Sequence, residues 1–406
     1  MPVMTNIGIL YACKDDGVQK DIHELKNAAL VWEKEKIVWV GHEDALPDMY
    51  SEMERMDAGG NMVIPGLIDC HTHLAFGGWR EDEYELRSLG RPYIEIAKAG
   101  GGILNSVRNT REATEDELIE VCIERLDEIK KLGVTTVECK SGYGLNKEDE
   151  LKVLRVYRKL DALQPLDIIS TFLGAHTIPP EYKENREEYI RLLTDDLIPF
   201  IAENDLATFC DIFVEETAFS IDEARTILGT AKKAGFGLKL HADQLSSGGG
   251  AELAAELGAV SADHLEYISD DGIRAMAKAN TVAVSIPFAT FYLRQQSIPA
   301  RKLIDAGVPV AVSTDFNPGS APSYHLPLAM HLGCTLQYMS PAEVLKGATL
   351  YAAKALNLDT HTGSLEPGKN ADFAVIKSKS INHWMYHFTP NACQMTVKDG
   401  RVIWSV

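Results

Sequence analysis

One stretch decides the fold, Met62-Val63-Ile64-Pro65-Gly66-Leu67-Ile68-Asp69-Cys70-His71-Thr72-His73. Its apolar first part predicts a buried strand over residues 62–69. Side chains two apart in a strand project to the same face, so His71 and His73 are expected to point the same way. Neutral imidazole is the commonest protein ligand for zinc and also suits iron. The stretch therefore predicts a strand that leads into a metal site.

The middle of the chain alternates predicted strands with predicted helices. The capping box Thr114-Glu115-Asp116-Glu117 begins one helix, and glycine or asparagine closes several others before the next strand. Eight apolar strands are predicted, at 62–69, 134–140, 166–173, 209–214, 237–240, 259–262, 281–286 and 308–314. Eight parallel strands in about 250 residues favour a (β/α)8 barrel, whose active sites lie where the strands end. An open doubly wound sheet is the alternative, but no Gly-x-Gly-x-x-Gly follows an early strand.

Both ends of the chain are rich in shorter predicted strands. These lie at 7–12, 28–33 and 36–40 and again at 371–376, 394–398 and 402–404, with Asp399-Gly400 as the final turn. We expect an antiparallel unit in which the two ends pair beside the barrel. The predicted division is 1–61 with 362–406 for the small domain and 62–361 for the catalytic barrel.

Composition limits the class of protein. A chain of 406 residues exceeds a single core, which stops growing at about 250–300 residues. The net charge of −19 disfavours a nucleic-acid partner, and no apolar run reaches the roughly 20 residues that span a bilayer. No basic residue precedes the first apolar stretch, and seven scattered cysteines show no paired spacing. We expect a cytoplasmic protein without a secretory signal, a disulfide framework or a membrane partner.

Polar residues collect where four predicted barrel strands end. They are His71-Thr72-His73, His241-Ala242-Asp243, Asp263-His264 and Thr314-Asp315. We assign the metal ligands to His71, His73, His241 and Asp315. Three imidazoles and a carboxylate suit zinc or iron (Zn2+ or Fe2+/Fe3+) better than magnesium or calcium. Asp315 could also accept a proton from an activated water, and His264 is either a further ligand or a group that polarises a carbonyl or relays a proton.

Taken together, these residues resemble the amidohydrolase superfamily, metal-dependent barrels with a small β-sandwich built from both chain ends. The likeness covers the whole chain. It is carried by Pro65-Gly66-Leu67-Ile68-Asp69 with residues 71–80, by Lys140-Ser141-Gly142-Tyr143-Gly144-Leu145, by Gly174-Ala175-His176, and by Asp315-Phe316-Asn317-Pro318-Gly319-Ser320. The last three motifs are the more specific, and they resemble members that open an imidazolone ring in histidine degradation. The resemblance implies hydrolysis of 4-imidazolone-5-propanoate to N-formimidoyl-L-glutamate by a metal-activated water.

The resemblance also implies a set of substrate-binding residues. By matched motif these are Arg80, Tyr143, His176, Gln244, Asn317, Gly319 and Ser320. The planar fork of Arg80 suits the propanoate of an anionic substrate, and the turn after Asp315 could present further donors to it. Binuclear relatives commonly carry a carbamylated lysine at the end of strand four, where this chain has Asp211-Ile212-Phe213-Val214-Glu215-Glu216. One metal ion per subunit is therefore expected.

The chain departs from many related hydrolases and deaminases three residues after the strand-five histidine. They carry glutamate there as a proton shuttle, whereas this chain has Gln244, which hydrogen-bonds but cannot transfer a proton. We expect Asp315 and His264 to do the acid–base work, with Gln244 beside them mainly in binding. Two rival interpretations are a mononuclear-metal deaminase of a heterocyclic base and a non-catalytic scaffold. The sequence leaves open whether the enzyme is a homodimer.

Overall fold

The stretch that leads into His71 and His73 is divided between two sheets. The computed structural model, which describes residues 2–91, 101–387 and 391–406, has β5 (Met62–Pro65), then Gly66, then β6 (Leu67–Thr72). A Cβ on Gly66 would lie 2.4 Å from Thr135 Oγ1, so only glycine allows the chain to cross so close to the neighbouring strand. The prediction of one strand over 62–69 is wrong, because the chain changes sheets at this glycine.

The second sheet is the barrel, and its strands follow one another in chain order. They are β6, β7 (Val134–Lys140), β8 (Asp167–Ala175), β9 (Phe209–Val214), β10 (Gly237–Ala242), β11 (Ser261–His264), β12 (Val282–Ser285) and β13 (Val310–Val312). All neighbouring pairs are parallel. The segment after β13 meets β6, since Asp315 N–H donates to His71 O over 3.0 Å and His73 N–H donates to Phe316 O over 2.8 Å. The predicted (β/α)8 barrel is confirmed.

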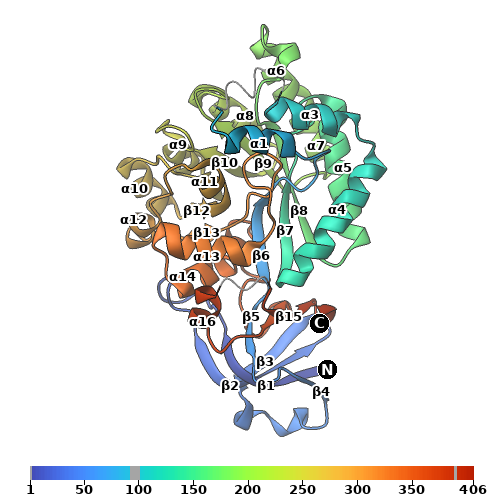
Figure 1. Cartoon of the computed structure of the whole chain (residues 1–406), viewed down its shortest axis with the longest axis vertical. Helices are drawn as coiled ribbons and strands as arrows, with labels where there is room; N and C mark the ends of the chain where they lie inside the picture. Colours follow the sequence, from blue (N-terminus) through green and yellow to red (C-terminus); the bar gives the residue numbers. More distant parts are fainter. Residues whose placement is uncertain (1, 92–100, 388–390) are drawn as a thin grey trace.

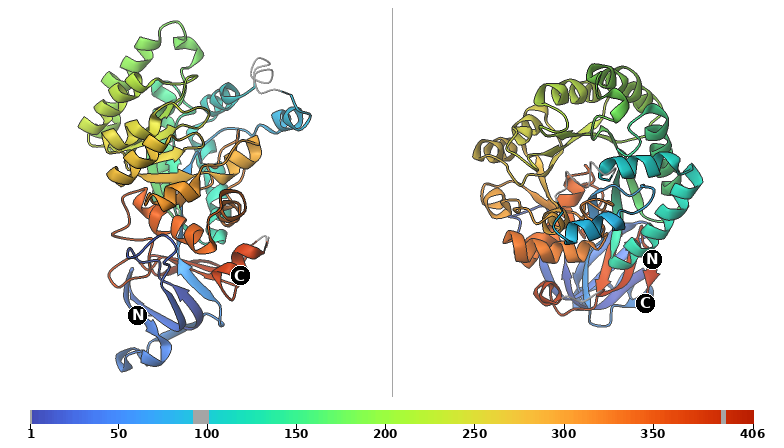
Figure 2. Two further views of the ribbon diagram at one scale, coloured as in Figure 1. Left: turned by 90° about the vertical axis from the view of Figure 1, so that its left-hand side faces the viewer. Right: turned by 45° about the horizontal axis from the view of Figure 1, so that its top comes forward.

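Helices surround these strands in a ring, as the right-hand view of Figure 2 shows. They are α1 (Glu81–Ser88), α3 (Ile103–Glu112), α4 (Glu115–Ile129), α5 (Lys147–Leu163), α6 (Arg186–Arg191), α7 (Ile198–Glu203), α8 (Ile221–Lys233), α9 (Gly250–Leu257), α10 (Asp270–Ala279), α11 (Pro287–Leu293), α12 (Ala300–Asp305), α13 (Leu326–Gln337), α14 (Pro341–Gly347) and α15 (Leu350–Lys354). The capping box predicted for α4 is confirmed, because Glu117 N–H donates to Thr114 Oγ1 and Thr114 N–H to Glu117 Oε2.

The first sheet combines both ends of the chain and lies below the barrel in Figure 1. It contains β1 (Pro2–Tyr11), β2 (Glu24–Glu33), β3 (Lys36–His42), β4 (Glu54–Asp57), β5, β14 (Phe373–Ile376), β15 (Cys393–Lys398) and β16 (Arg401–Ser405), with the short α16 (Ile381–Tyr386) beside it. Trp32 of β2 meets Phe373 of β14 edge to face, with ring centroids 5.2 Å apart, although β5 and β1 separate these strands in the sheet. The sheet therefore curls over its own apolar core in the manner of a small sandwich.

The prediction of a purely antiparallel unit is wrong, since β1 runs parallel to both β4 and β5. The chain leaves β3 through two short 3-10 helices, Glu43–Ala45 and Asp48–Tyr50, and so returns to β1 in the same direction. The division into 1–61 with 362–406 and 62–361 stays a proposal, and the pairing of β5 favours a first boundary at Gly66. Within the described residues, no helix has the length and apolar character needed to cross a membrane.

Candidate metal centre

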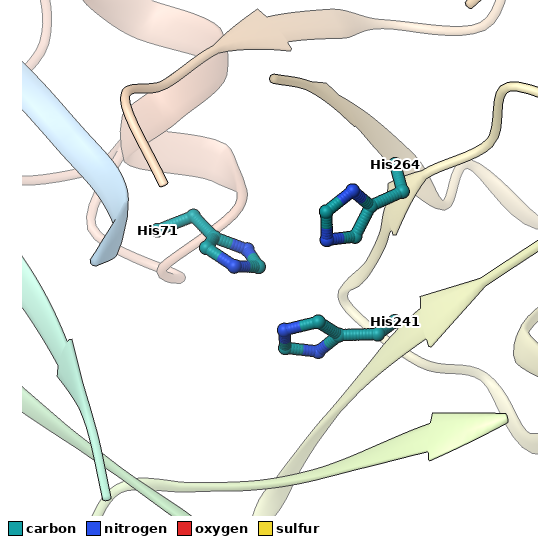
Figure 3. A group of neighbouring side chains, drawn as sticks. All are labelled: His71, His241 and His264. Carbon is teal, nitrogen blue, oxygen red and sulfur yellow. The ribbon is translucent and has the colours of Figure 1, made fainter. Parts of the chain in front are cut away.

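Five polar side chains converge at the mouth of the barrel. One group of possible ligands is His71, His241 and His264, and another is His71, His73 and Asp315, with the ligand atoms of each group within 4.8 Å of one another. Figure 3 shows the first group, whose three rings face a common space from β6, β10 and β11. The structure therefore brings together all four assigned ligands and adds His264 at the same place.

The spacing and burial of these atoms fit a divalent cation. Asp315 Oδ1 lies 3.4 Å from Nε2 of His71 and 3.4 Å from Nε2 of His73, and the ring centroids of His71 and His241 are 4.6 Å apart. In the described part of the chain, Nε2 of His71 and Nε2 of His241 are buried without a hydrogen-bond partner. Unpartnered buried nitrogens cost free energy unless something binds them, and a cation at their meeting point would do so.

Two buried aspartates hold the far sides of these imidazoles. Asp263 Oδ2 lies 2.6 Å from Nδ1 of His71, and Asp211 Oδ2 lies 3.1 Å from Nδ1 of His241. The hydrogen bond from Nδ1 to Asp263 fixes the tautomer of His71 and leaves the lone pair of Nε2 for a metal, whereas Asp211 lies within ion-pair distance of His241 without such a bond. Neither aspartate was given a role from the sequence, although Asp263 was named among the polar residues at the strand ends. Asp211 is a charged residue inside the otherwise apolar strand β9, which is the signal that could have identified it.

Burial and charge set the protonation of the site. Burial lowers the pKa of His73 to about 4 and that of His264 well below its ordinary value, so both rings are neutral at pH 7, as metal binding requires. Burial also lowers the pKa of His71, but the carboxylates of Asp263 and Asp315 outweigh it and raise that pKa to about 9, so a metal that binds Nε2 displaces a proton from this ring. Burial alone would raise the pKa of Asp315, but its hydrogen bonds with His71 and His73 hold that pKa well below its usual range.

The backbone is strained where these side chains leave their strands. Asp243, His264, Leu265 and Asp315 have φ angles of 48°, 78°, 68° and 56°. Residues other than glycine rarely adopt such angles, and where they persist they cluster at functional sites. This conformation turns the chain sharply at the ends of β10 and β11 and shortly after β13.

Tyr143 and His176 lie against the metal-facing rings. His176 stacks on His73 with centroids 5.2 Å apart and an interplanar angle of 18°, and its Nδ1 lies 3.0 Å from Gly142 O. The Tyr143 ring is 5.6 Å from both His73 and His176. These two predicted substrate contacts thus form one aromatic wall of the site.

Arg80 precedes α1 and is held by an ion pair that the sequence analysis did not predict. Its Nε and Nη2 lie 3.0 and 2.7 Å from Glu83 Oε2, and both side chains are less than a tenth exposed. The other Glu83 oxygen accepts from Gly102 N–H over 2.9 Å. A Cβ on Gly319 would lie 2.4 Å from Arg80 Nη1, so the guanidinium rests directly on this glycine. Arg80 is therefore fixed against the turn that follows Asp315.

The turn after Asp315 uses most of its donors internally. Asn317 Oδ1 accepts from the N–H groups of Gly319 and Ser320 over 2.7 and 2.8 Å, and Asn317 Nδ2 donates to Asp315 O over 2.6 Å. Ser320 Oγ donates to Asp315 Oδ2 over 3.4 Å. In this structure the donors that were expected to face an anion are bonded within the turn, and the substrate contacts of Asn317, Gly319 and Ser320 stay predictions. The turn supports Asp315 on one side and Arg80 on the other.

Gln244 follows β10 on the rim and is half-buried. The preceding Asp243 accepts from the N–H groups of Gly248, Gly250 and Ala251 over 2.8, 3.2 and 3.0 Å. This carboxylate therefore fixes the glycine-rich loop that begins α9 and, with it, the backbone that carries Gln244.

Comparisons with known proteins agree with this geometry. The model of the amidohydrolase family matches residues 62–403. An imidazolonepropionase of Fusobacterium nucleatum is 46% identical over 406 residues, covering 99% of this chain and 98% of the relative. One from Geobacillus thermodenitrificans is 46% identical over 387 residues, covering 94% and 91%.

Solved structures share the fold at much lower identity. A triazine hydrolase of Arthrobacter aurescens superposes with a TM-score of 0.76 at 16% identity, covering 99% of this chain and 94% of that one. The guanine deaminase of E. coli superposes with a TM-score of 0.75 at 14% identity, covering 100% and 99%. At such identities the likeness establishes the architecture alone, whereas the sequence relatives reach further. The chain belongs to the amidohydrolase family and, within it, to the imidazolonepropionases.

Proposed function

We propose that this chain hydrolyses 4-imidazolone-5-propanoate to N-formimidoyl-L-glutamate, a step of histidine degradation. Water adds to the ring carbonyl carbon, the C–N bond of the cyclic amide breaks, and the released nitrogen takes up a proton. The observation that carries this function is the 46% identity, over nearly all of both chains, to an imidazolonepropionase. The geometry of the barrel mouth supports it with a metal-fitting cluster and a cation for the substrate's carboxylate.

The proposed ligands of the metal are His71, His73, His241 and Asp315, and we infer one zinc or iron ion per subunit. Bound there, the ion would supply a water of lowered pKa and polarise the substrate carbonyl. The residues hold that geometry from behind, since Asp263 and Asp211 fix the rings of His71 and His241. All four ligands are buried, so bulk water does not weaken their electrostatic effect.

Proton transfer is assigned to Asp315 with His264. Asp315 is ionised at neutral pH and can take a proton from the attacking water and deliver it to the leaving ring nitrogen. The hydroxyl of Ser320 donates to Asp315 Oδ2 and so orients the second oxygen of this carboxylate. Neutral His264 faces the same space and can donate a hydrogen bond to the carbonyl oxygen as charge develops on it. Gln244 contributes a hydrogen bond to the ring rather than a proton.

Arg80 is the proposed partner of the propanoate. Glu83 engages Nε and Nη2, and Gly319 lies against Nη1, so the fork is held in a fixed position before substrate arrives. Pre-orientation lowers the entropy cost of binding the carboxylate. Tyr143 and His176 provide the aromatic wall on which the flat ring can pack.

The test is incubation with freshly prepared imidazolone propanoate while the imidazolone absorbance is followed. We expect the absorbance to fall, to stop falling after a chelator removes the metal, and to fall again when zinc or ferrous iron is returned. The His71→Ala variant, made the same way, should stay inactive after metal is returned. Ammonia release from guanine or cytosine, with no loss of imidazolone, would replace this function by that of a deaminase.

The partner that this proposal requires is the small anionic substrate, without nucleic acid or membrane. The homodimer and the cytoplasmic location stay predictions. Sedimentation of the purified protein at several concentrations would determine the first.

A further inference from the structure

Lys140 is a charged residue in the barrel interior that the proposed chemistry does not use. It ends β7, and its side chain has no exposed surface. Its Nζ lies 2.8 Å from Glu138 Oε1, 2.8 Å from Asp211 Oδ2 and 3.6 Å from Asp263 Oδ2. Although burial lowers it, the carboxylates of Asp211 and Glu138 raise the pKa of Lys140 above its ordinary value, so the amine is an ammonium.

Lys140 is connected to the proposed ligands His241 and His71 through one carboxylate oxygen each. Asp211 Oδ2, which faces Lys140, also lies 3.1 Å from Nδ1 of His241. Asp263 Oδ2, which faces Lys140 as well, lies 2.6 Å from Nδ1 of His71. One ammonium is therefore paired with the two oxygens that lie against the Nδ1 atoms of His241 and His71.

The other oxygens of these carboxylates are also fixed. Asp263 Oδ1 accepts from Ser261 Oγ over 2.7 Å, and Asp211 Oδ1 accepts from Ile212 N–H over 2.7 Å. Each carboxylate is thus held at one oxygen by its own strand, and at the other it is shared between Lys140 and a histidine. Lys239 also attracts Asp263, but without the Lys140 ammonium Asp211, Asp263 and Glu138 would repel one another more strongly in a space that excludes water. The two aspartates that lie against histidines would then shift.

We propose that Lys140 is a positioning residue of the metal centre, which holds Asp211 and Asp263 so that His241 and His71 present Nε2 to the cation. This inference rests on the proposed ligand set. It predicts that the affinity for metal depends on a side chain that touches neither metal nor substrate. Partners beyond the ligands typically change metal affinity by 10–100-fold when they are removed.

The experiment measures the affinity of metal-free protein for Zn2+ by competition with a chromophoric chelator, and the visible spectrum after Co2+ is bound. We expect Lys140→Met to weaken Zn2+ binding by about 10–100-fold and to alter the Co2+ bands. The matched control is Lys398→Met, because Lys398 is also buried and also faces three carboxylates. They belong to Asp167, Asp372 and Asp399, for none of which a histidine contact is seen among the described residues. It should lower the Tm and leave Zn2+ affinity and the Co2+ spectrum unchanged.

A second variant separates positioning from simple charge balance. The double change Lys140→Met with Glu138→Gln removes one charge of each sign, so Glu138 does not remain as a buried carboxylate without its lysine. We expect it to fold better than Lys140→Met alone and still to bind Zn2+ about 10-fold more weakly than wild type. Wild-type Zn2+ affinity in either folded variant would overturn the inference, as would failure of both variants to fold, which would make Lys140 a folding residue. If the unaltered protein binds no metal, the proposed function fails first, and the two failures are thus distinguishable.

Discussion

Two clusters in this molecule each set one buried lysine against three carboxylates, but their other contacts differ. Lys140 faces Glu138, Asp211 and Asp263 inside the barrel, and Lys398 faces Asp167, Asp372 and Asp399 between the barrel and the small sheet. Each holds one ammonium against three carboxylates. The first is fully buried, whereas the side chains of Asp167 and Asp399 in the second are 38% and 34% exposed.

The clusters differ in where their remaining contacts go. Around Lys398, Asp372 accepts from Thr362 Oγ1 and from Asp399 N–H, and Asp399 accepts from Asn370 Nδ2. Around Lys140, two carboxylates reach histidines whose Nε2 atoms find no hydrogen-bond partner in the described chain. The second cluster therefore joins the barrel to the small sheet, whereas the first leads to imidazole nitrogens that a metal can bind.

The largest contrast is expected between Asp315, which lies beside His71 and His73 in the proposed metal site, and Asp372 of the Lys398 cluster. Asp315→Asn should lower kcat by about 10³-fold or more, because it removes both a ligand and the proton acceptor. Asp372→Asn should leave kcat unchanged and cost about 1–3 kcal/mol of unfolding free energy, since it disturbs a buried acceptor. Steady-state kinetics measure kcat and urea denaturation measures the unfolding free energy of each variant. Near-normal kcat in Asp315→Asn would refute the role of that residue.

The next contrast concerns the carboxylates behind the ligands. Asp263→Asn should weaken metal binding by about 10–100-fold, because the neutral amide no longer holds the Nδ1 proton of His71 as firmly. Asp167→Asn, in the other cluster, should not change metal affinity. Chelator competition measures both variants, and equal affinities would remove the distinction between the clusters.

A third substitution extends the comparison to the buried ion pair between Arg80 and Glu83. Arg80→Met should raise KM by about 10–100-fold, the equivalent of about 1.5–3 kcal/mol for a charged hydrogen bond, with a smaller change in kcat. Arg274→Met, which alters an exposed arginine paired with Asp271 on α10, should change neither constant. The proposed partner of the propanoate would be wrong if kcat fell while KM stayed constant.

The smallest effect is expected at Gln244, which lies on the rim outside both clusters. Gln244→Ala should raise KM by about 2–10-fold through the loss of one neutral hydrogen bond and keep kcat within about 2-fold. Gln244→Asn serves as the control that retains an amide. A kcat that falls further than KM rises would show that this amide takes part in the chemical step.

Much of this arrangement could be predicted from local sequence signals. Val134–Lys140 and Phe209–Val214 were predicted with the bounds observed, because each apolar run is closed by polar residues or glycine. The ligand positions followed from histidines and an aspartate placed where strands end. The change of sheet at Gly66 was missed, since an apolar run does not show which sheet each half joins. Only the close approach to Thr135 makes the break visible.

Contacts between distant segments could not be predicted. Asp263 lies 192 residues from His71, and Lys140 lies 71 residues from Asp211, so nothing local pairs them. The donors of the turn after Asp315 were expected to face an anion, but Gly319 and Ser320 donate to Asn317 Oδ1 instead. The sequence does not show whether a donor in a turn is free or is bonded within that turn. Glu83 was missed for a related reason, because an acidic residue on a short helix usually faces water.

The most direct test of the account is the metal content of the purified protein set against its turnover. We predict about one equivalent of zinc or iron per chain, with imidazolone hydrolysis lost on chelation and restored in proportion to the metal returned. Full turnover with less than about a tenth of an equivalent bound would contradict the claim that three imidazoles and a carboxylate hold one catalytic cation.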